Sequence, residues 1–203
     1  MTDPLAPVRA RLASGGEVRL GGLGDSLTQG WMVRRSFFDL ACDAIAARFP
    51  AARVERRNAG MPGDTADGGL GRLPTLLAWR PDVVVVEFGF NDAVVGIPAP
   101  AFGRRIEAIG EAVSASGGLP VPATACPVAV PEVQVLVRPL WAQIREVARR
   151  RGWPLADLEA HWLRALSTGR AGPGLHLGDG VHPNQEGHAL LARGLLEALV
   201  GSA

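Results

Sequence analysis

The sequence predicts an α/β fold in which helices cover both faces of a parallel sheet. The run VVVVEF at residues 83–88 begins with four consecutive β-branched valines and shows no polar alternation among them, which is typical of a strand buried on both faces. Strand-like and helix-like segments then alternate five times, and this order indicates parallel βαβ units with right-handed crossovers. The strands are expected at residues 17–23, 52–57, 83–88, 119–125 and 152–158.

Between these segments, apolar residues recur at the spacing of one helical face. The clearest helices are expected at residues 34–49 and 183–200. The apolar faces of the expected helices include Phe37 and Ile45, Leu73 and Leu76, Phe102 and Ile106, Leu140 and Ile144, and Leu191 and Leu195. Residues 127–138 are unusually apolar and read either as a loop or as the start of a helix. Residues 159–181 are expected to be mostly irregular.

A chain of 203 residues is long enough for one domain with a sizeable core. The composition, with 47% hydrophobic and 20% charged residues, is that of an ordinary globular protein. Residues 1–16 are rich in Pro, Ala and Gly and are expected to form an arm or a short irregular lead-in. Residues 17–203 are expected to form a single domain without internal repeats.

The charge pattern excludes several partners and chemistries. A net charge of +1 gives no support for binding to nucleic acid or to an anionic membrane. No window reaches the roughly 18 apolar residues of a membrane span, and the N-terminus lacks the pattern of a signal peptide. The sequence therefore predicts a cytoplasmic protein, unless a leader has been removed. All 21 basic residues are arginine, and the absence of lysine rules out Schiff-base or Ser–Lys catalysis.

The two cysteines, Cys42 and Cys126, lack the spacing of metal ligands and are expected to be buried free thiols. Neither a metal nor an organic cofactor is expected.

The stretch GLGDSLTQG at residues 22–30 joins a predicted strand to a helical pattern. It places Ser26 at the carboxyl end of the strand, on a turn that glycines make more flexible. Such a turn exposes the serine side chain and points backbone N–H groups into the space beside it. Ser26 is therefore a candidate nucleophile, although serines in such turns also serve as helix caps.

A second candidate group precedes the last helix. Asp179 and His182 are three residues apart, so the carboxylate can accept a hydrogen bond from Nδ1 and leave Nε2 free to take a proton from a serine. Pro183 suits the first turn of the following helix. The alternative is that His182 only begins this helix and Asp179 only forms the turn. His176 is the next candidate for a base.

Two further turns could supply hydrogen-bond donors. Asn91 follows the valine-rich strand, and its side-chain amide could donate to a developing oxyanion. Gly63 follows the second predicted strand, and its backbone N–H could do the same because glycine allows close approach. Both residues could equally be ordinary turn formers.

These stretches resemble the blocks of the GDSL-type esterase/lipase family, which belongs to the SGNH hydrolase superfamily. The four blocks occur in the family's order, and together they span nearly the whole domain. They are GDSL at residues 24–27, NAGMPGDT at residues 58–65, GFND at residues 89–92 and DGVH at residues 179–182.

The resemblance implies a three-layer α/β/α sandwich of flavodoxin-like type with a five-stranded parallel sheet. It also implies a carboxylic ester hydrolase, with Ser26 as nucleophile, His182 as base and acid, and Asp179 as the orienting partner of His182. The oxyanion hole would use the backbone N–H groups of Ser26 and Gly63 and the amide of Asn91. Asp25 would be mainly structural.

The substrate is expected to be a small-molecule ester with a short or medium acyl chain, and an acetylated sugar is one candidate. Trp31, Met32 and Phe37 follow the nucleophile turn, and Val94, Val95 and Ile97 follow Asn91. These residues could line an acyl pocket, or they could pack in the core. The candidates for substrate binding are Trp31, Met32, Val94 and Val95. An acyltransferase, a lysophospholipase or a thioesterase would use the same residues. A ligand-binding domain that keeps the fold is the non-enzymatic alternative, and the sequence leaves the oligomeric state open.

A dinucleotide-binding site is disfavoured. The stretch at residues 22–27 begins like a G-x-G-x-x-G fingerprint, but Leu27 replaces the third glycine.

Overall fold

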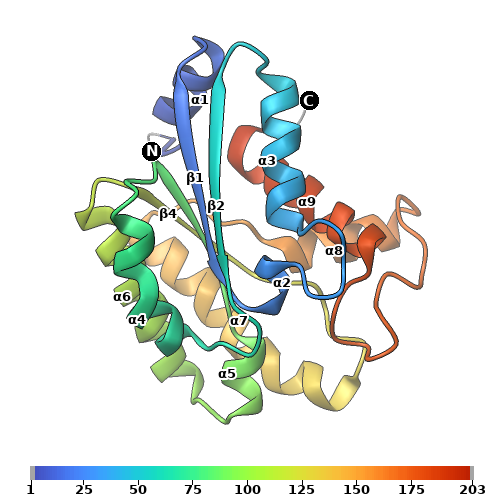
Figure 1. The fold of residues 1–203 in the computed structure, drawn as a ribbon. Helices are drawn as coiled ribbons and strands as arrows, with labels where there is room; N and C mark the ends of the chain where they lie inside the picture. Colours follow the sequence, from blue (N-terminus) through green and yellow to red (C-terminus); the bar gives the residue numbers. More distant parts are fainter. Residues whose placement is uncertain (1–2, 202–203) are drawn as a thin grey trace.

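A parallel sheet lies at the centre of the molecule (Figure 1). The computed structural model describes residues 3–201, and within them the sheet has four strands in the order β2-β1-β3-β4. The strands are β1 (Glu17–Gly24), β2 (Arg53–Gly60), β3 (Val83–Glu87) and β4 (Leu119–Ala123). Each pairs in parallel with its neighbours, as the sequence predicts.

Helices cover both faces of this sheet. Neighbouring residues on a strand point to opposite faces. A Cβ atom at Gly21 would touch Leu76 of α4, whereas one at Gly22 would touch Phe38 of α3, so these helices lie on opposite sides. Helix α9 packs beside α3, while α6 packs against α4 and α7 (Figure 1). The bounds of these helices are α3 (Phe37–Arg48), α4 (Ala66–Leu77), α6 (Ala99–Ala115), α7 (Pro131–Arg151) and α9 (Gln185–Val200).

The core lies between the sheet and these two helical layers. The four valines of β3 are at most 1% exposed, which agrees with the expectation of a strand buried on both faces. The largest fully buried side chains include Trp141 of α7, Trp162 of α8 (Leu158–Ser167), and Phe37 and Phe38 of α3.

The strand register brings three strand ends to one edge of the sheet. Gly24, at the end of β1, pairs with Gly60 of β2 on one side and with Glu87 of β3 on the other. The segments that follow these three strands therefore start side by side. They carry the GDSL, NAGMPGDT and GFND blocks of the sequence.

The predicted fifth strand at residues 152–158 is wrong. This segment makes one parallel bridge, between Ala123 and Ala156. The Ala156 N–H donates to Pro122 O at 3.0 Å, so Pro122 faces this segment, yet proline has no N–H to donate in return. Pro120, two residues earlier, faces the same way and also lacks a backbone N–H. The ladder therefore cannot extend along β4.

Two segments expected to be irregular are helical. In the predicted lead-in, α1 (Ala6–Ala13) packs against β1, with Val8 and Leu12 buried. In the predicted irregular region, α8 begins after Asp157, whose carboxylate accepts from Ala160 N at 3.2 Å. Leu158, Trp162 and Ala165, at helical spacing, form the buried face of α8. The division into an arm and a single domain stays a prediction.

The segment that could be a loop or a helix is divided between the two. Residues 127–130 are irregular, and α7 begins at Pro131 and continues through Pro139. Within residues 3–201, each helix is too short or too polar to cross a membrane.

Candidate active site

Ser26 lies on a tightly constrained turn between β1 and the short helix α2 (Ser26–Gln29) (Figure 1). The Asp25 carboxylate caps α2 by accepting from Leu27 N at 2.9 Å. A Cβ atom at Gly24 would lie 2.1 Å from Thr28 Oγ1, so only glycine fits at the start of the turn. The turn thus holds Ser26 at the edge of the sheet where the three strands end.

The loop before α9 reaches the same edge. Ser26 Oγ lies 2.9 Å from His182 Nε2, and His182 Nδ1 lies 2.7 Å from Asp179 Oδ2. The other Asp179 oxygen accepts from the backbone N–H groups of Val181 and His182, each at 2.9 Å. The structure therefore brings the three residues predicted as a triad into one hydrogen-bonded chain.

The charge of Asp179 suits this arrangement. Partial burial opposes ionisation, but the hydrogen bonds from the His182 ring and from two backbone N–H groups outweigh it and hold the pKa of Asp179 below its usual range. Asp179 is therefore a carboxylate at neutral pH and can orient the imidazole ring and stabilise its protonated form.

Two of the three predicted oxyanion donors, Gly63 and Asn91, lie in the segments that follow β2 and β3. Gly63 has a φ of +77°, which favours glycine, and a Cβ atom there would meet nothing within 4 Å, so its backbone borders open space. Asn91 belongs to α5 (Phe90–Val94). Its Nδ2 donates to Asp64 O at 2.9 Å and lies 3.3 Å from Asp25 Oδ2. Asn91 thus lies between the nucleophile turn and the Gly63 loop.

A buried acidic pair beneath Ser26 is a feature that sequence reasoning missed. Asp25 and Glu87 are both fully buried, and Thr28 Oγ1 donates to Glu87 Oε2 at 2.8 Å. Burial raises the pKa of Asp25 to about 6 and that of Glu87 well above its usual range. Burial and the neighbouring Asp25 therefore favour the protonated form of Glu87. The sequence signal was an acidic residue that ends a fully buried valine run.

Asn58 and Asp92 hold the surrounding loops. Asn58 Nδ2 donates to Thr28 O at 2.7 Å, which ties β2 to the nucleophile helix. The Asp92 carboxylate accepts from Ala66 N at 3.1 Å and so fixes the start of α4. Both side chains act on the backbone around the site.

The four residues proposed to bind substrate are not part of the core. Trp31 is 45% exposed, Met32 75%, Val94 57% and Val95 63%. By contrast, Phe37 is fully buried in α3 and Ile97 is partly buried against the core, so these two residues pack in the interior. Packing in the interior is therefore wrong for the four exposed residues Trp31, Met32, Val94 and Val95. Their contact with substrate stays a prediction.

The remaining histidines do not contact Ser26. His176 Nε2 lies 2.7 Å from Pro127 O, and His161 Nδ1 lies 3.2 Å from Glu197 Oε2. His188 is buried in α9, where Nδ1 accepts from Phe37 N at 3.0 Å, and burial lowers its pKa to about 4.

Cys42 and Cys126 are buried and unpaired, as predicted, and burial raises the pKa of both thiols. Among the residues that the structure describes, no group of His, Cys, Asp or Glu is arranged to hold a metal ion.

Comparison with known proteins agrees with these features. The model of the GDSL-like Lipase/Acylhydrolase family matches residues 23–190. An arylesterase from Vibrio mimicus is 38% identical over 89 residues, which cover 42% of this chain and 44% of that protein. The match thus spans less than half of this curated relative.

Solved structures share the fold over nearly the full length. A lipase/acylhydrolase from Enterococcus faecalis is 29% identical, with a TM-score of 0.72 over 91% of this chain and 96% of that chain. Axe2, an acetylxylan esterase from Geobacillus stearothermophilus, has a TM-score of 0.79 over 92% of this chain and 95% of its own. At 18% identity, that likeness shows the fold alone.

All four sequence blocks, from Gly24 to His182, lie inside the matched region, and the SGNH fold agrees with the solved structures. The resemblance read from the sequence is confirmed. The chain belongs to the GDSL-like lipase/acylhydrolase family.

Proposed function

We propose that the protein is a serine esterase that hydrolyses a small carboxylic ester through an acyl-enzyme on Ser26. The observation that carries this proposal is the chain of contacts from Ser26 Oγ to His182 Nε2 at 2.9 Å and from His182 Nδ1 to Asp179 Oδ2 at 2.7 Å. These separations allow proton transfer from the serine to the imidazole. The family of the chain supports the reaction class.

In the first half-reaction, Ser26 Oγ attacks the ester carbonyl carbon while His182 Nε2 takes the hydroxyl proton. The ionised Asp179 stabilises the imidazolium that forms. His182 then returns the proton to the departing alcohol as the bond between carbonyl carbon and alkoxy oxygen breaks. In the second half-reaction, His182 deprotonates a water molecule that attacks the acyl carbon. The bond between this carbon and Ser26 Oγ then breaks, His182 returns the proton to Oγ, and the acid is released.

The negative oxygen of each tetrahedral intermediate needs donors near Ser26. We assign the backbone N–H groups of Ser26 and Gly63 and the amide of Asn91 to this role. One Nδ2 proton of Asn91 is used by Asp64 O at 2.9 Å. The other faces Asp25 Oδ2 at 3.3 Å, a long contact that can be exchanged for a bond to the oxyanion.

For the substrate, we propose an ester with a short or medium acyl chain, flanked by the exposed side chains of Trp31, Met32, Val94 and Val95. The match to an arylesterase makes p-nitrophenyl and phenyl esters suitable probes. Activity on p-nitrophenyl esters should fall from acetate toward palmitate. A rise toward palmitate would instead indicate a lipase or lysophospholipase. Acetylated xylo-oligosaccharides test the acetyl-sugar alternative.

The test of the mechanism is Ser26→Ala with p-nitrophenyl acetate. Loss of the nucleophile should lower kcat on the order of 10⁶-fold and abolish labelling by a fluorophosphonate. Ser116→Ala is the matched control, because Ser116 lies at the opposite end of the sheet after α6 and its hydroxyl donates to Val113 O. Wild-type activity in a folded Ser26→Ala protein would disprove the nucleophile.

Asn91→Ala tests the oxyanion assignment in the same assay. Removal of one donor should lower kcat by about 10²–10³-fold, with a smaller change in KM, because the bond strengthens as charge develops on the oxygen. Unchanged kcat would remove Asn91 from the oxyanion hole and leave the Ser26 assignment standing.

A further inference from the structure

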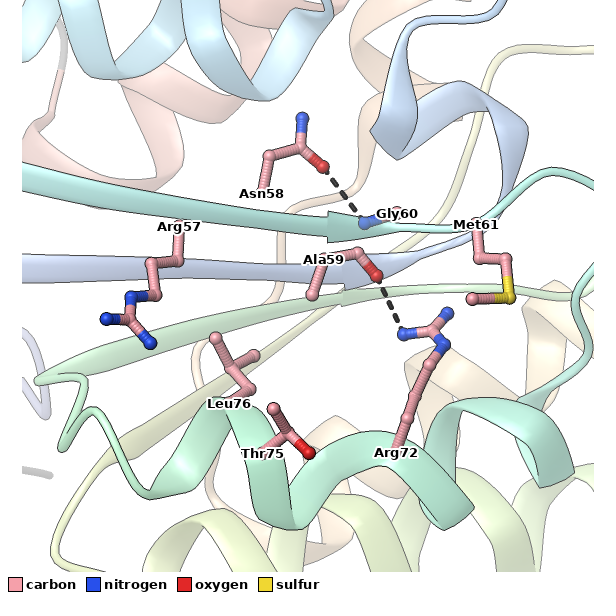
Figure 2. A pocket seen from close by; sticks show the side chains of 8 residues that line it. All are labelled: Arg57, Asn58, Ala59, Gly60, Met61, Arg72, Thr75 and Leu76. Atoms are coloured by element: carbon pink, nitrogen blue, oxygen red, sulfur yellow. Dashed lines mark hydrogen bonds between the residues drawn. The ribbon is translucent and has the colours of Figure 1, made fainter.

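A cavity of about 500 Å³ lies beside the ends of β2 and α4 (Figure 2). Its lining residues are Arg57, Asn58, Ala59, Gly60, Met61, Arg72, Thr75 and Leu76. Figure 2 shows the Arg72 side chain rising from α4 toward the strand ends, with its guanidinium group beside Ala59. Arg72 is the lining residue that connects this cavity with the nucleophile turn.

The guanidinium group of Arg72 contacts three separate segments. Nη1 donates to Ala59 O at 2.7 Å, and Nη2 donates to Gly24 O at 2.8 Å. Nε donates to Asp64 Oδ2 at 2.8 Å, and Nη2 also lies 2.6 Å from this oxygen. One side chain therefore joins the end of β1, the end of β2 and the loop that follows β2.

Two of these contacts, with Gly24 and Asp64, lie close in sequence to a proposed oxyanion donor. Gly24 is two residues before Ser26, and Asp64 directly follows Gly63. The backbone carbonyl of Asp64 in turn accepts the 2.9 Å hydrogen bond from Asn91 Nδ2. The relative positions of all three donors therefore depend on segments that Arg72 holds together.

The contacts explain why this residue is an arginine. A guanidinium group has donors fixed in one plane, which can point at three acceptors at once. A lysine ammonium group carries one compact charge and cannot span the same acceptors. The side chains in this ion pair are only 20% (Arg72) and 13% (Asp64) exposed, so water is poorly placed to replace these contacts.

We infer that Arg72 is a positioning residue for the oxyanion hole, acting through Gly24, Ala59 and Asp64 rather than by touching the substrate. The inference rests on the proposed esterase function. It predicts that loss of Arg72 lowers transition-state stabilisation more than it weakens substrate binding, because donors displaced by a fraction of an ångström still leave the binding surface in place.

The experiment compares Arg72→Ala and Arg72→Lys with Arg57→Ala, using p-nitrophenyl acetate. Arg57 lines the same cavity, but its guanidinium carbon lies 4.9 Å from the centre of the Trp79 ring and away from the oxyanion loop. Both Arg72 variants should lower kcat about 10- to 100-fold, below the loss of a whole donor, with KM changed by less than about threefold. Arg57→Ala should match the wild type.

Chemical rescue separates positioning from a general loss of structure. The cavity gives a small cation access to the space that Arg72→Ala leaves empty, so methylguanidinium at millimolar concentration should restore part of the lost kcat. It should have no such effect on the wild type or on Arg57→Ala. Circular dichroism tests whether each variant is folded.

Several results would overturn the inference. They are a folded Arg72→Ala with wild-type kcat, a loss carried by KM alone, or a kcat that methylguanidinium does not restore. If Arg72→Ala does not fold, Arg72→Lys decides by the same kcat and KM criteria. If neither variant folds, Arg72 serves the fold and the inference fails. Failure of the esterase proposal is distinct, because Ser26→Ala would then keep the wild-type activity.

Discussion

The two halves of the candidate site are built in opposite ways. The nucleophile half grows out of the sheet, where Asp25 and Glu87 are fully buried beneath Ser26. The acid–base half is a loop before α9, where the side chain of Asp179 is 45% exposed and that of His182 is 20% exposed. The first half is fixed by the sheet register and by buried hydrogen bonds. The second is held by the contacts between Asp179 and His182 and by one backbone hydrogen bond from Ala129 N to Gly180 O at 2.7 Å.

The electrostatics differ in the same way. In the buried half, desolvation dominates, and it raises the pKa of both Asp25 and Glu87. In the exposed loop, hydrogen bonds from His182 and from the backbone outweigh partial burial and lower the pKa of Asp179. The two environments thus shift the pKa of acidic groups in opposite directions, upward under the nucleophile and downward behind the base. Two kinds of environment give acidic residues different roles in one site.

The largest expected effect tests the exposed loop. His182→Ala removes the only base in contact with Ser26 among residues 3–201, so kcat should fall by about 10⁴-fold or more. Asp179→Ala should cost at least about tenfold less than His182→Ala, because water can reach an exposed position and partly replace the carboxylate.

The assay is steady-state hydrolysis of p-nitrophenyl acetate, with His176→Ala as the control. His176 contacts Pro127 O instead of Ser26, so its loss should leave kcat near the wild-type value. Equal losses of kcat for His182→Ala and Asp179→Ala would show that water cannot replace the Asp179 carboxylate, even though this position is exposed.

The contrast also explains which features could be predicted from the sequence. The predicted site residues each lie at a turn and carry a chemical group whose role depends on local geometry; they are Ser26, Asn91, Asp179 and His182. Their proximity follows from parallel strands that end at one edge, and the structure places them accordingly, while their roles stay predictions. Arg72 gives no such signal, because its three contacts exist only once β1, β2 and the following loop are assembled.

The failures at the fifth strand and at α8 have physical causes. Pro120 and Pro122 alternate along β4 and remove two consecutive donors from its outer edge, a pattern that is visible in the sequence but matters only when the neighbouring segment is known. Helix α8 follows Asp157, a helix cap, and buries Leu158 and Trp162. The start of α8 was not predicted, because glycines lie nearby and residues 152–158 were expected to form a strand.

A smaller effect concerns a buried group outside both halves, His188 of α9, and it is tested through pH. Burial lowers the pKa of His188 in the fold to about 4, below its ordinary value of 6.5. The unfolded chain therefore takes up this proton first, and stability is lost as pH falls from about 6.5 toward 4. The full effect is about 3 kcal/mol.

His188→Gln keeps a hydrogen-bond acceptor that can reach Phe37 N and removes the titratable imidazole group. Urea unfolding at about pH 7 and about pH 4 should show a drop in stability for the wild type that exceeds the variant's by about 3 kcal/mol. Contributions from Asp25 and Glu87 are common to both proteins and cancel in this difference. Parallel pH curves for the two proteins would show that His188 is hydrated in solution.

The smallest expected effect returns to the exposed loop. Gly180, between Asp179 and His182, has a φ of +68°, a conformation that costs an L-residue about 1–2 kcal/mol. A Cβ atom there would also lie 3.2 Å from Val130 Cγ2. Gly180→Ala should therefore lower the free energy of unfolding by about 1–2 kcal/mol, and it should lower kcat because His182 shifts relative to Ser26.

Gly71→Ala is the matched control, since Gly71 lies inside α4 and a Cβ atom there meets nothing within 4 Å. It should stabilise the protein by about 0.5–1 kcal/mol and leave kcat unchanged. Thermal unfolding and kcat measured on both variants separate backbone strain from the mere addition of a methyl group. Suppose that Gly180→Ala lost stability but kept the wild-type kcat. The contact between Ser26 and His182 would then be held by residues outside the loop. The exposed half would depend less on its own short-range contacts than the buried half depends on the sheet.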